Sequence, residues 1–355
     1  MNTHVGEVAG LDAVRMRSDL GSFDCRNNRL AQLALEQDGF AQEVARARER
    51  YGARRIGVFL GTSTSGILET ELAYRRRDPG TGALPEDFHY ATTQNTFSVA
   101  HFVQSYLNLE GPAVVVSSAC STTAKVFGNA QRMLAAGLCD AAIVGGADSL
   151  CLTTLYGFHA LGLVSEQACR PFDADRDGIS IGEAAGFVLI EKPRARGLSE
   201  CVHLLGVGES SDAYHMSTPH PEGLGARLAM ERALASSALA PDAIDYVNLH
   251  GTATRTNDAA EDQAIVGLLG PATPCSSTKG WTGHTLGAAG VTETIICALA
   301  IQHGIRPGSL HTRRVDPTLK SNYLIEHQLG TIDRVMSNSF GFGGSNCSLV
   351  LGRAP

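Results

Sequence analysis

The sequence predicts an α/β protein with a parallel or mixed sheet that helices cover on both faces. Two observations support this fold class. Short apolar runs that are typical of buried strands alternate with longer segments of helical period, as in βαβ units. Glycine is also abundant, at 39 of 355 residues, and it concentrates at the ends of apolar runs, where a chain turns between a strand and a helix.

In the first part of the chain, strands are expected at four short apolar runs. They are Arg55–Leu60, Ala113–Ser117, Asp140–Val144 and Gly186–Ile190. The segment Ser121–Ala136 carries apolar residues at helical spacing, and Gly137 follows where a C-cap glycine is expected. The sequence therefore predicts a strand–turn–helix order with glycine-rich turns.

The second part of the chain repeats this order. Helices are expected at Arg227–Ser237, Asp258–Leu268 and Glu293–Gln302, and strands at Ile244–Leu249 and Asn346–Leu351. The polar stretch Lys192–Ser199 separates the two series. We therefore expect two halves, residues 1–200 and residues 201–355, with a boundary near Glu200.

Composition excludes several classes of protein. The chain is 43% hydrophobic and 18% charged, which is typical of a globular protein, and its net charge of −7 argues against a general nucleic-acid binder. The longest apolar runs, such as Ile295–Ile301, are far shorter than the roughly 20 residues of a membrane helix. The N-terminus lacks a basic segment followed by an apolar one, so we expect no signal peptide and a cytoplasmic protein.

One of the nine cysteines stands in an unusual context. No two cysteines have CxxC spacing, so no metal site is expected. Cys120 follows the strand run Val114–Val116 and precedes the helical segment, whereas the other eight cysteines lack such a setting. Free N–H groups and the positive end of a helix dipole lower a thiol pKa and can stabilise an oxyanion. By itself this context favours a nucleophile and a buried structural cysteine about equally.

Two of the 12 histidines also stand out. His250 lies at the end of a predicted strand, where α/β sheets place ligands, and small residues flank His284 and allow a substrate to approach the backbone. Alone, either histidine is more often a packed or surface residue, and Lys279 an ordinary surface lysine. Together with a cysteine, they fit nucleophilic catalysis at a thioester. The glycine-rich stretch Asn338–Asn346 favours a flexible loop with an aromatic gate over a phosphate cradle.

Five segments, in this order, resemble the ketosynthase family of the thiolase-like superfamily, and its elongating β-ketoacyl-acyl carrier protein synthases in particular. They are SSACS at Ser117–Ser121, RPFDADRDGISIGEAAG at Arg170–Gly186, LHGTATRTND at Leu249–Asp258, STKGWTGHTLGAAG at Ser277–Gly290 and NSFGFGGSN at Asn338–Asn346. The resemblance covers the chain from roughly Arg55 to the end. It implies a five-layered αβαβα sandwich of two similar halves, usually a homodimer in which the partner's Thr92–Phe102 region lines part of the acyl pocket.

The resemblance also implies a reaction. Cys120 would take an acyl chain from the phosphopantetheine of an acyl carrier protein, and His250 and His284 would promote decarboxylation of a malonyl thioester. The carbanion would then attack the Cys120 thioester and yield a 3-oxoacyl product. Backbone N–H groups of Cys120 and Phe342 would form the oxyanion hole, with Phe342 as the gate. This chemistry requires no metal or redox cofactor.

Further residues receive supporting roles by the same resemblance. Lys279 would organise the site, with Glu293 and Glu261 as candidate ion partners and Asp258 as a further supporting charge. Thr252 and Thr254 would bind the pantetheine arm. Because the carrier protein is acidic in this family, a basic rim is expected near the pocket. The weak candidates for this rim are Arg132, Arg170 and Arg255.

The chain departs from the family pattern in two places. The family usually opens with a strand and a turn of the type VxTGxGxxxPxG, and no such motif is present, so we expect the first strand to be absent. If that strand were central, its loss would expose a sheet edge and apolar surface. The segment Ser118–Thr123 around the nucleophile also differs from fatty-acid enzymes and favours a specialised acyl substrate slightly.

Two alternatives follow from the same motifs. Starter-type synthases that act on coenzyme A thioesters have asparagine in place of the second histidine, so His284 argues against them. A non-catalytic, chain-length-factor-like subunit of a heterodimer lacks the nucleophile, so Cys120 argues against that interpretation. The sequence leaves open both fatty-acid elongation and a specialised polyketide or aryl-polyene route.

Overall fold

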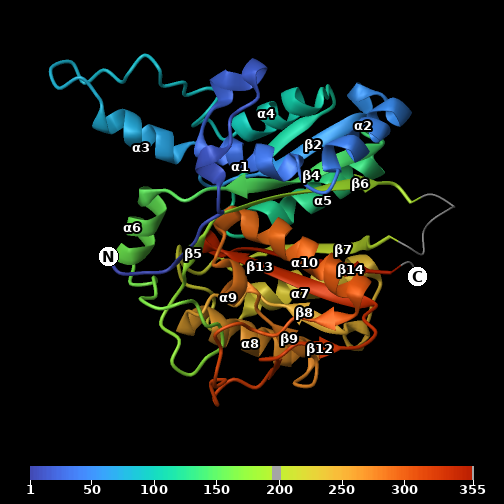
Figure 1. Cartoon of the computed structure of the whole chain (residues 1–355). Helices are drawn as coiled ribbons and strands as arrows, with labels where there is room; N and C mark the ends of the chain where they lie inside the picture. Colours follow the sequence, from blue (N-terminus) through green and yellow to red (C-terminus); the bar gives the residue numbers. More distant parts are fainter. Residues whose placement is uncertain (194–200, 354–355) are drawn as a thin grey trace.

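The computed structural model describes residues 1–193 and 201–353, and it contains two stacked sheets with helices between and outside them (Figure 1). From one side to the other, the layers are helices, a four-stranded sheet, helices, a six-stranded sheet and helices. This is the five-layered αβαβα sandwich that the sequence predicts, so the predicted fold class is confirmed. The boundary expected near Glu200 lies outside the described residues.

The upper sheet has the strand order β3-β2-β4-β6. Its strands are β2 (Ile56–Gly61), β3 (Ala113–Val116), β4 (Ala141–Asp148) and β6 (Ala184–Glu191). The first three are parallel, and β6 is antiparallel to β4. Its outer face is covered by α1 (Arg26–Leu35), α2 (Phe40–Tyr51) and α4 (Ser98–Leu107). The buried side chains of these helices, such as Val44 and Phe102, pack with Val58 and Ile143 of the sheet in one apolar cluster.

The lower sheet has the strand order β11-β9-β8-β13-β14-β7. Its strands are β7 (His203–Ser211), β8 (Tyr246–Asn248), β9 (Pro274–Ser276), β11 (Asn322–Tyr323), β13 (Arg334–Gly341) and β14 (Ser345–Gly352). β14 is antiparallel to both β13 and β7, and the other pairs are parallel. Helices α7 (Leu224–Ser237) and α8 (Arg255–Leu269) cover the outer face.

Two helices form the central layer between the sheets. They are α5 (Thr122–Ala135), which follows β3, and α10 (Ala289–His303), which follows the loop after β9. At their crossing a Cβ on Gly290 would lie 2.4 Å from the backbone nitrogen of Ala124. The two helices therefore meet backbone to backbone, which only glycine allows at this position.

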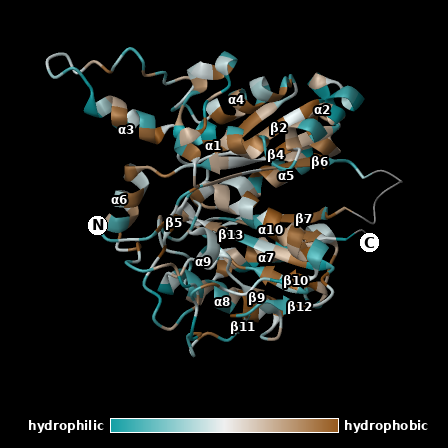
Figure 2. Ribbon diagram, viewed as in Figure 1, coloured by the Kyte–Doolittle hydropathy of each residue, from teal (hydrophilic) through white to brown (hydrophobic). Residues whose placement is uncertain are grey.

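The segment Leu286–His303 is the one stretch among the described residues that is long and apolar enough to pass as a membrane helix, by length and composition alone. In the fold it lies between the two sheets, and 61% of it is buried there. Hydrophobic residues are concentrated in the strands and in the helix faces that meet them (Figure 2). The apolar character of this segment is therefore that of a core helix.

The remaining elements are short. They are α3 (Ile67–Arg75), α6 (Leu152–Ala160), α9 (Lys279–Thr282), the strand pair β1 (Val5–Gly6) and β5 (Ile181–Gly182), the strand pair β10 (Ile305–Arg306) and β12 (Gln328–Leu329), and the 3₁₀ helices η1 (Leu11–Ala13), η2 (Ser18–Phe23), η3 (Ala53–Arg55), η4 (Pro241–Ala243), η5 (Leu286–Ala288) and η6 (Phe342–Gly344). α3 and the segment after it project from the upper sheet (Figure 1).

The structure shows where a first strand is missing. In the lower sheet β7, the first strand of its half, pairs with β14 at the sheet edge. Within residues 1–193 and 201–353, no strand occupies the matching place beside β6, whose ladder partner is β4. The expected absence of a first strand is therefore seen in the described sheet. The missing strand is an edge strand beside β6, so the possibility that a central strand is lost is wrong.

Two predicted boundaries need correction. β4 does not end at Val144 but continues through Gly145 and Gly146 to Asp148. A Cβ on either glycine would lie 2.0 Å from a backbone oxygen of a neighbouring strand. Glycine at these two positions therefore lets β4 pack closely against its neighbours and stay in the sheet. The expected loop Asn338–Asn346 is also shorter than predicted, because its first four residues belong to β13 and only η6 forms the turn into β14.

Candidate active site

Cys120 lies in the turn between β3 and α5, with 5% of its surface exposed. Its neighbour Ala119 has φ 51°, in the left-handed region that residues with a Cβ rarely adopt. Side chains of the next two residues hold this turn: Ser121 Oγ donates to the Ser118 carbonyl at 2.9 Å, and Thr122 Oγ1 to the Ala119 carbonyl at 2.6 Å. The strained turn thus fixes Cys120 just before the N-terminus of α5.

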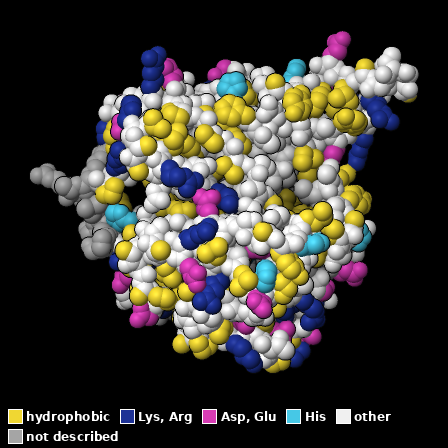
Figure 3. Space-filling view, turned by 180° about the vertical axis from the view of Figure 1, so that it is seen from behind, with side chains coloured by type: hydrophobic (Ala, Val, Ile, Leu, Met, Phe, Trp, Pro, Cys, Tyr) yellow, Lys and Arg dark blue, Asp and Glu magenta, His cyan; other side chains and the backbone are white. Residues whose placement is uncertain are grey.

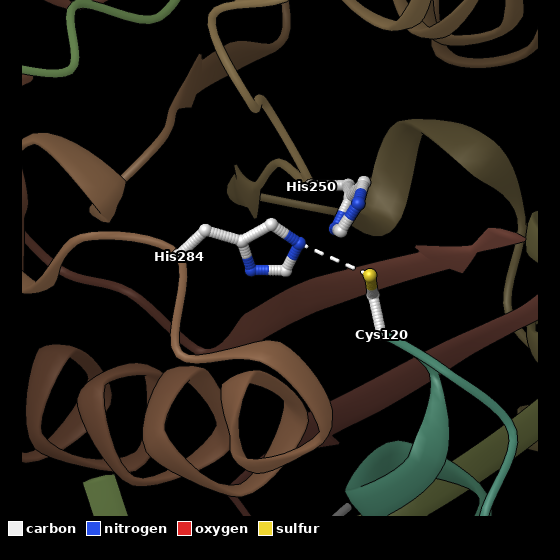
Figure 4. Close-up of side chains that lie close together, drawn as sticks. All are labelled: Cys120, His250 and His284. Atoms are coloured by element: carbon white, nitrogen blue, oxygen red, sulfur yellow. Dashed lines mark hydrogen bonds between the residues drawn. The ribbon is translucent and has the colours of Figure 1, made fainter. Parts of the chain in front are cut away.

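The two histidines come from the lower half and lie beside Cys120 of the upper half (Figure 4). His284 Nε2 lies 3.1 Å from Cys120 Sγ, and the rings of His250 and His284 have centroids 5.3 Å apart at 82°. The sulfur and one nitrogen of each ring all lie within 4.8 Å of one another. Both histidines are 2% exposed. The structure therefore brings together the three residues that the sequence singled out.

Backbone hydrogen bonds hold the segments that carry the two histidines. Glu261 accepts hydrogen bonds from the backbone N–H groups of His250 and Gly251, each at 2.8 Å. The backbone of His284 pairs with the β5 segment, since its N–H donates to Ser180 O at 2.7 Å and its carbonyl accepts from Gly182 N at 2.9 Å. The backbone on both sides of the site is therefore held in place, and the rings themselves contact Cys120 Sγ in the case of His284 and Lys279 Nζ in the case of His250.

Lys279 is fully buried below His250. Its ammonium group donates to the His250 carbonyl and to the Glu293 carboxylate, and it lies 3.4 Å from His250 Nδ1. Of the two expected ion partners, only Glu293 pairs with Lys279. Glu261 is directed instead to the backbone of the His250 loop, so the structure corrects that assignment.

Asp258 supports the neighbouring loop and pairs with a residue that sequence reasoning missed. Its carboxylate accepts from the backbone N–H groups of Thr252, at 3.1 Å, and of Phe172, at 2.9 Å. It also forms a buried ion pair with Arg176 at 3.1 Å, and Arg176 pairs in turn with Asp316 at 2.8 Å. Arg176 lies within a quoted motif, but nothing local in the sequence indicates its partner 82 residues away.

Burial shifts the pKa values of the reacting groups. It raises the pKa of the Cys120 thiol to about 11, against opposing effects from the Lys279 charge and the Phe342 backbone N–H. Burial, together with the Lys279 charge, holds the pKa values of His250 and His284 well below the usual range. Burial therefore opposes the lowering of the thiol pKa that the helix N-terminus was expected to give. With these shifts the site holds a thiol beside two neutral imidazoles at neutral pH.

A pocket whose empty space is about 610 Å³, open solvent included, reaches this cluster. Thr252 and Thr254 line it, with their hydroxyl oxygens 2.9 Å apart. The lining also contains Cys120 and four apolar side chains: Phe158, Leu163, Ile179 and Phe340. One pocket therefore combines Cys120 and apolar surface with the hydroxyl groups of the predicted pantetheine ligands.

Phe342 lies in η6 and lines the cavity. Its ring contacts Phe158, with centroids 5.5 Å apart, and the next residue, Gly343, has φ 80° and donates its N–H to the Met216 carbonyl at 2.7 Å. The backbone N–H of Phe342 lies close enough to the Cys120 sulfur to lower the thiol pKa. The position of Phe342 is thus compatible with both roles that the resemblance implies.

The residues expected at protein interfaces lie on the surface to different degrees. Thr96 and Phe97, at the start of α4, are exposed, whereas Val99 and Phe102 are buried in the upper core. Arg132 pairs with Glu209 and Arg170 with Asp177, while Arg255 is exposed directly beside Thr254 at the cavity. On the face that Figure 3 shows, Lys and Arg side chains are interspersed with Asp and Glu rather than gathered into one basic field.

Two profiles of known families match the chain. The Beta-ketoacyl synthase N-terminal domain matches residues 22–195, and the Beta-ketoacyl synthase C-terminal domain matches residues 202–313. The chain belongs to the β-ketoacyl synthase family. Among curated β-ketoacyl synthases, the 3-oxoacyl-[acyl-carrier-protein] synthase 2 of Rhizobium meliloti is 38% identical over 84% of this chain and 74% of its own length. The mitochondrial 3-oxoacyl-[acyl-carrier-protein] synthase of Arabidopsis thaliana is 40% identical over 68% of this chain, which spans only 56% of that enzyme.

Solved ketosynthase structures share the fold. The ketosynthase ApeO of Xenorhabdus doucetiae, solved in complex with its chain length factor ApeC, is 42% identical, with a TM-score of 0.90 over 99% of this chain and 86% of its own. A β-ketoacyl synthase from Burkholderia phymatum is 30% identical, with a TM-score of 0.85 over 96% of this chain and 85% of its own. Both the family and the fold expected from the five motifs are therefore confirmed.

Proposed function

We propose that this chain catalyses the decarboxylative condensation of an acyl thioester with malonyl-acyl carrier protein, as a 3-oxoacyl-acyl carrier protein synthase. One observation carries the proposal: Cys120 Sγ lies 3.1 Å from His284 Nε2 in a buried cluster that also contains His250. The printed names of the curated relatives, 3-oxoacyl-[acyl-carrier-protein] synthases, describe this reaction class. An acyl thioester, malonyl-acyl carrier protein and one proton yield 3-oxoacyl-acyl carrier protein, CO₂ and free carrier protein.

The first half-reaction moves the acyl group to Cys120. Because the thiol pKa is about 11, the free site holds few thiolates at neutral pH, and the proton must leave during attack. Neutral His284 accepts it through Nε2, and the sulfur attacks the incoming thioester carbonyl. The tetrahedral oxyanion is stabilised by the N–H groups of Cys120 and Phe342, and the departing pantetheine thiolate takes the proton.

The second half-reaction forms the new C–C bond. The malonyl carboxylate leaves as CO₂, and negative charge develops on the thioester oxygen. Neutral His250, whose Nδ1 faces the Lys279 ammonium group, donates its Nε2–H to that oxygen. Neutral His284 donates from Nε2 as well, after its proton has moved from Nδ1, the tautomer of the first half-reaction, to Nε2. The carbanion attacks the Cys120 thioester, and the released thiolate is reprotonated. Lys279 positions His250 through the backbone carbonyl that it binds.

The remaining assignments belong to the same proposal. Thr252 and Thr254 bind the pantetheine arm of the acyl carrier protein, and Phe342 gates the cavity. The enzyme works in the cytoplasm without a metal or redox cofactor, because the malonyl group itself supplies the carbanion. It acts as a dimer, either of two such chains or with a chain-length-factor-like subunit; ApeO was solved in complex with its chain length factor ApeC.

The test is acylation of Cys120, followed by intact mass after incubation with acyl-carrier protein thioesters of several chain types. We expect a mass gain equal to the acyl group, loss of that gain in Cys120→Ala, and its retention in Cys169→Ala, which removes a second buried thiol near Thr252. A parallel assay follows malonyl-carrier decarboxylation, and the preferred acyl chain distinguishes fatty-acid from specialised synthesis. A folded, dimeric protein that no thioester acylates would overturn the proposal and favour a non-catalytic partner subunit.

A further inference from the structure

A buried carboxylate binds the loop that carries His284, and the reaction described above does not use it. Asp148, the last residue of β4, is fully buried and forms no ion pair within the described residues. Its carboxylate instead accepts six hydrogen bonds. The donors are Thr62 Oγ1, the backbone N–H and hydroxyl groups of Ser63 and Thr64, and the backbone N–H of Gly287. A buried carboxylate needs such donors when no cation is beside it.

The two oxygens of Asp148 serve different parts of the chain. Oδ1 accepts four bonds, all from the segment that follows β2, at 2.7–2.9 Å. Oδ2 accepts the Ser63 hydroxyl and the Gly287 N–H, the latter at 2.6 Å. Gly287 belongs to the lower half and lies three residues after His284. The carboxylate therefore joins the upper sheet directly to the loop that carries a catalytic histidine.

Gly287 is held from its other side as well. Its carbonyl accepts the Thr123 hydroxyl at 2.5 Å, and Thr123 lies in the first turn of α5, three residues after Cys120. A Cβ on Gly287 would lie 2.7 Å from Asp148 Oδ2, so no other residue fits between these partners. The neighbouring Leu286 has φ 53°, a strained conformation that only surrounding contacts can maintain.

We infer that Asp148 is a positioning residue that sets the distance between Cys120 and His284. Through the Gly287 N–H it fixes the histidine loop, and Thr123 binds the carbonyl of the same residue to the helix that follows the nucleophile. Asp148 lies outside the cavity-lining set, so it acts through these two groups and touches no substrate. This role deepens the proposed thioester chemistry, and its first test does not depend on that chemistry.

Asp148→Asn is the direct test, because asparagine keeps the shape but has one acceptor oxygen. If the one oxygen of asparagine takes the place of Oδ1, which accepts four hydrogen bonds, the NH₂ group takes the place of Oδ2. The Ser63 hydroxyl can rotate to accept from it, but the Gly287 N–H cannot, so the variant selectively breaks the contact with the histidine loop. Loss of the Asp148 charge by itself lowers the pKa of the Cys120 thiol and would speed alkylation. Slower alkylation of Cys120 by iodoacetamide at pH 7, by about tenfold, is therefore expected only because His284 Nε2 leaves the sulfur.

A second variant covers the case in which Asp148→Asn does not fold. Thr123→Val removes the other tie to Gly287 at nearly constant volume, and we expect a change of the same kind, of about threefold to tenfold. Thr294→Val is the matched control, because Thr294 is also buried and donates to a carbonyl of α10, that of Gly290, but has no contact with Gly287. It should leave the alkylation profile unchanged.

The acyl-transfer assay then separates the positioning role from the proposed function. If the wild-type protein is acylated, Asp148→Asn and Thr123→Val should each lower kcat with little change in KM, because neither substitution removes a substrate contact. If it is not acylated, the proposed function fails, while the alkylation contrast still tests the role of Asp148. Folded Asp148→Asn or Thr123→Val protein with the wild-type alkylation profile, or an equal change in Thr294→Val, would overturn the inference.

Discussion

The two halves of the molecule repeat one sheet design and use it for different chemistry. The order β3-β2-β4-β6 of the upper sheet corresponds to β9-β8-β13-β14 of the lower one, with three parallel strands and an antiparallel fourth in each. β3 leads to Cys120 and β9 to Lys279; β2 leads to the hydroxyl-rich segment that binds Asp148, and β8 to His250. Equivalent strand ends thus position Cys120 in one half and the basic residues His250 and Lys279 in the other.

Neither half contains a complete site by itself. The upper half provides a thiol whose imidazole partner, His284, belongs to the lower half. The lower half provides two imidazoles and a buried lysine, but its own strand β9 ends without a nucleophile. Catalysis therefore depends on how the two sheets are stacked, which makes the central layer and its buried charges the places where substitutions have the largest effects.

The largest effect is expected at Lys279, the lower-half counterpart of Cys120. Lys279→Met would leave the buried Glu293 carboxylate without its partner, and we expect a loss of about 3–5 kcal/mol of unfolding free energy. The double variant Lys279→Met/Glu293→Leu should recover most of that loss. Urea unfolding of the three proteins measures both effects. A single variant as stable as the wild type would show that this ion pair does not hold the lower half together.

A smaller loss of stability is expected where the two helices of the central layer cross. Gly290→Ala places a methyl group 2.4 Å from the backbone nitrogen of Ala124, and such overpacking costs about 1–3 kcal/mol. Gly157→Ala in α6 is the control, because nothing lies within 4 Å of its Cβ. It should stabilise the helix by about 0.5–1 kcal/mol. Thermal denaturation compares them, and equal shifts would argue against a tight crossing.

The stability of the lower half should also depend on pH. Because burial keeps His250 and His284 neutral in the fold, only the unfolded chain binds protons as the pH falls below about 6.5. Unfolding free energy then falls on acidification, by up to about 1.4 kcal/mol per pH unit for each histidine. We expect a shallower dependence in His284→Gln between pH 6.5 and 5, measured by urea unfolding. Parallel curves for the two proteins would mean that His284 titrates in the fold.

The smallest effect is expected at the strand edges. β14 is covered by β7, whereas no strand pairs with the outer edge of β6 in the part of the chain that the structure describes. Outward-facing amides of β6 should therefore exchange with deuterium at least about tenfold faster than the amides of β14 that bond to β7. Hydrogen exchange resolved by residue tests this. Equal protection would show that another segment covers the edge.

Sequence patterns predicted those parts of the fold and site that depend on local signals. Cys120 and His250 could be found because each follows an apolar strand, and α5 because its apolar residues recur at helical spacing. β4 was predicted too short, because glycines that keep a strand closely packed look like glycines that end it. The contacts of Asp148 with Gly287, across 139 residues, exist only after the halves stack, and no local pattern encodes them.

The close crossing of α5 and α10 also determines how a substrate can arrive. Since Gly290 allows the two helices to touch backbone to backbone, the halves cannot part like a hinged clamp without breaking the core between them. In the proposed reaction, a long acyl chain would then enter end-on through the pocket that Phe342 lines, and not between separated halves. A carrier that presents its cargo at the tip of a slender flexible arm meets this requirement, and a bulky rigid donor does not.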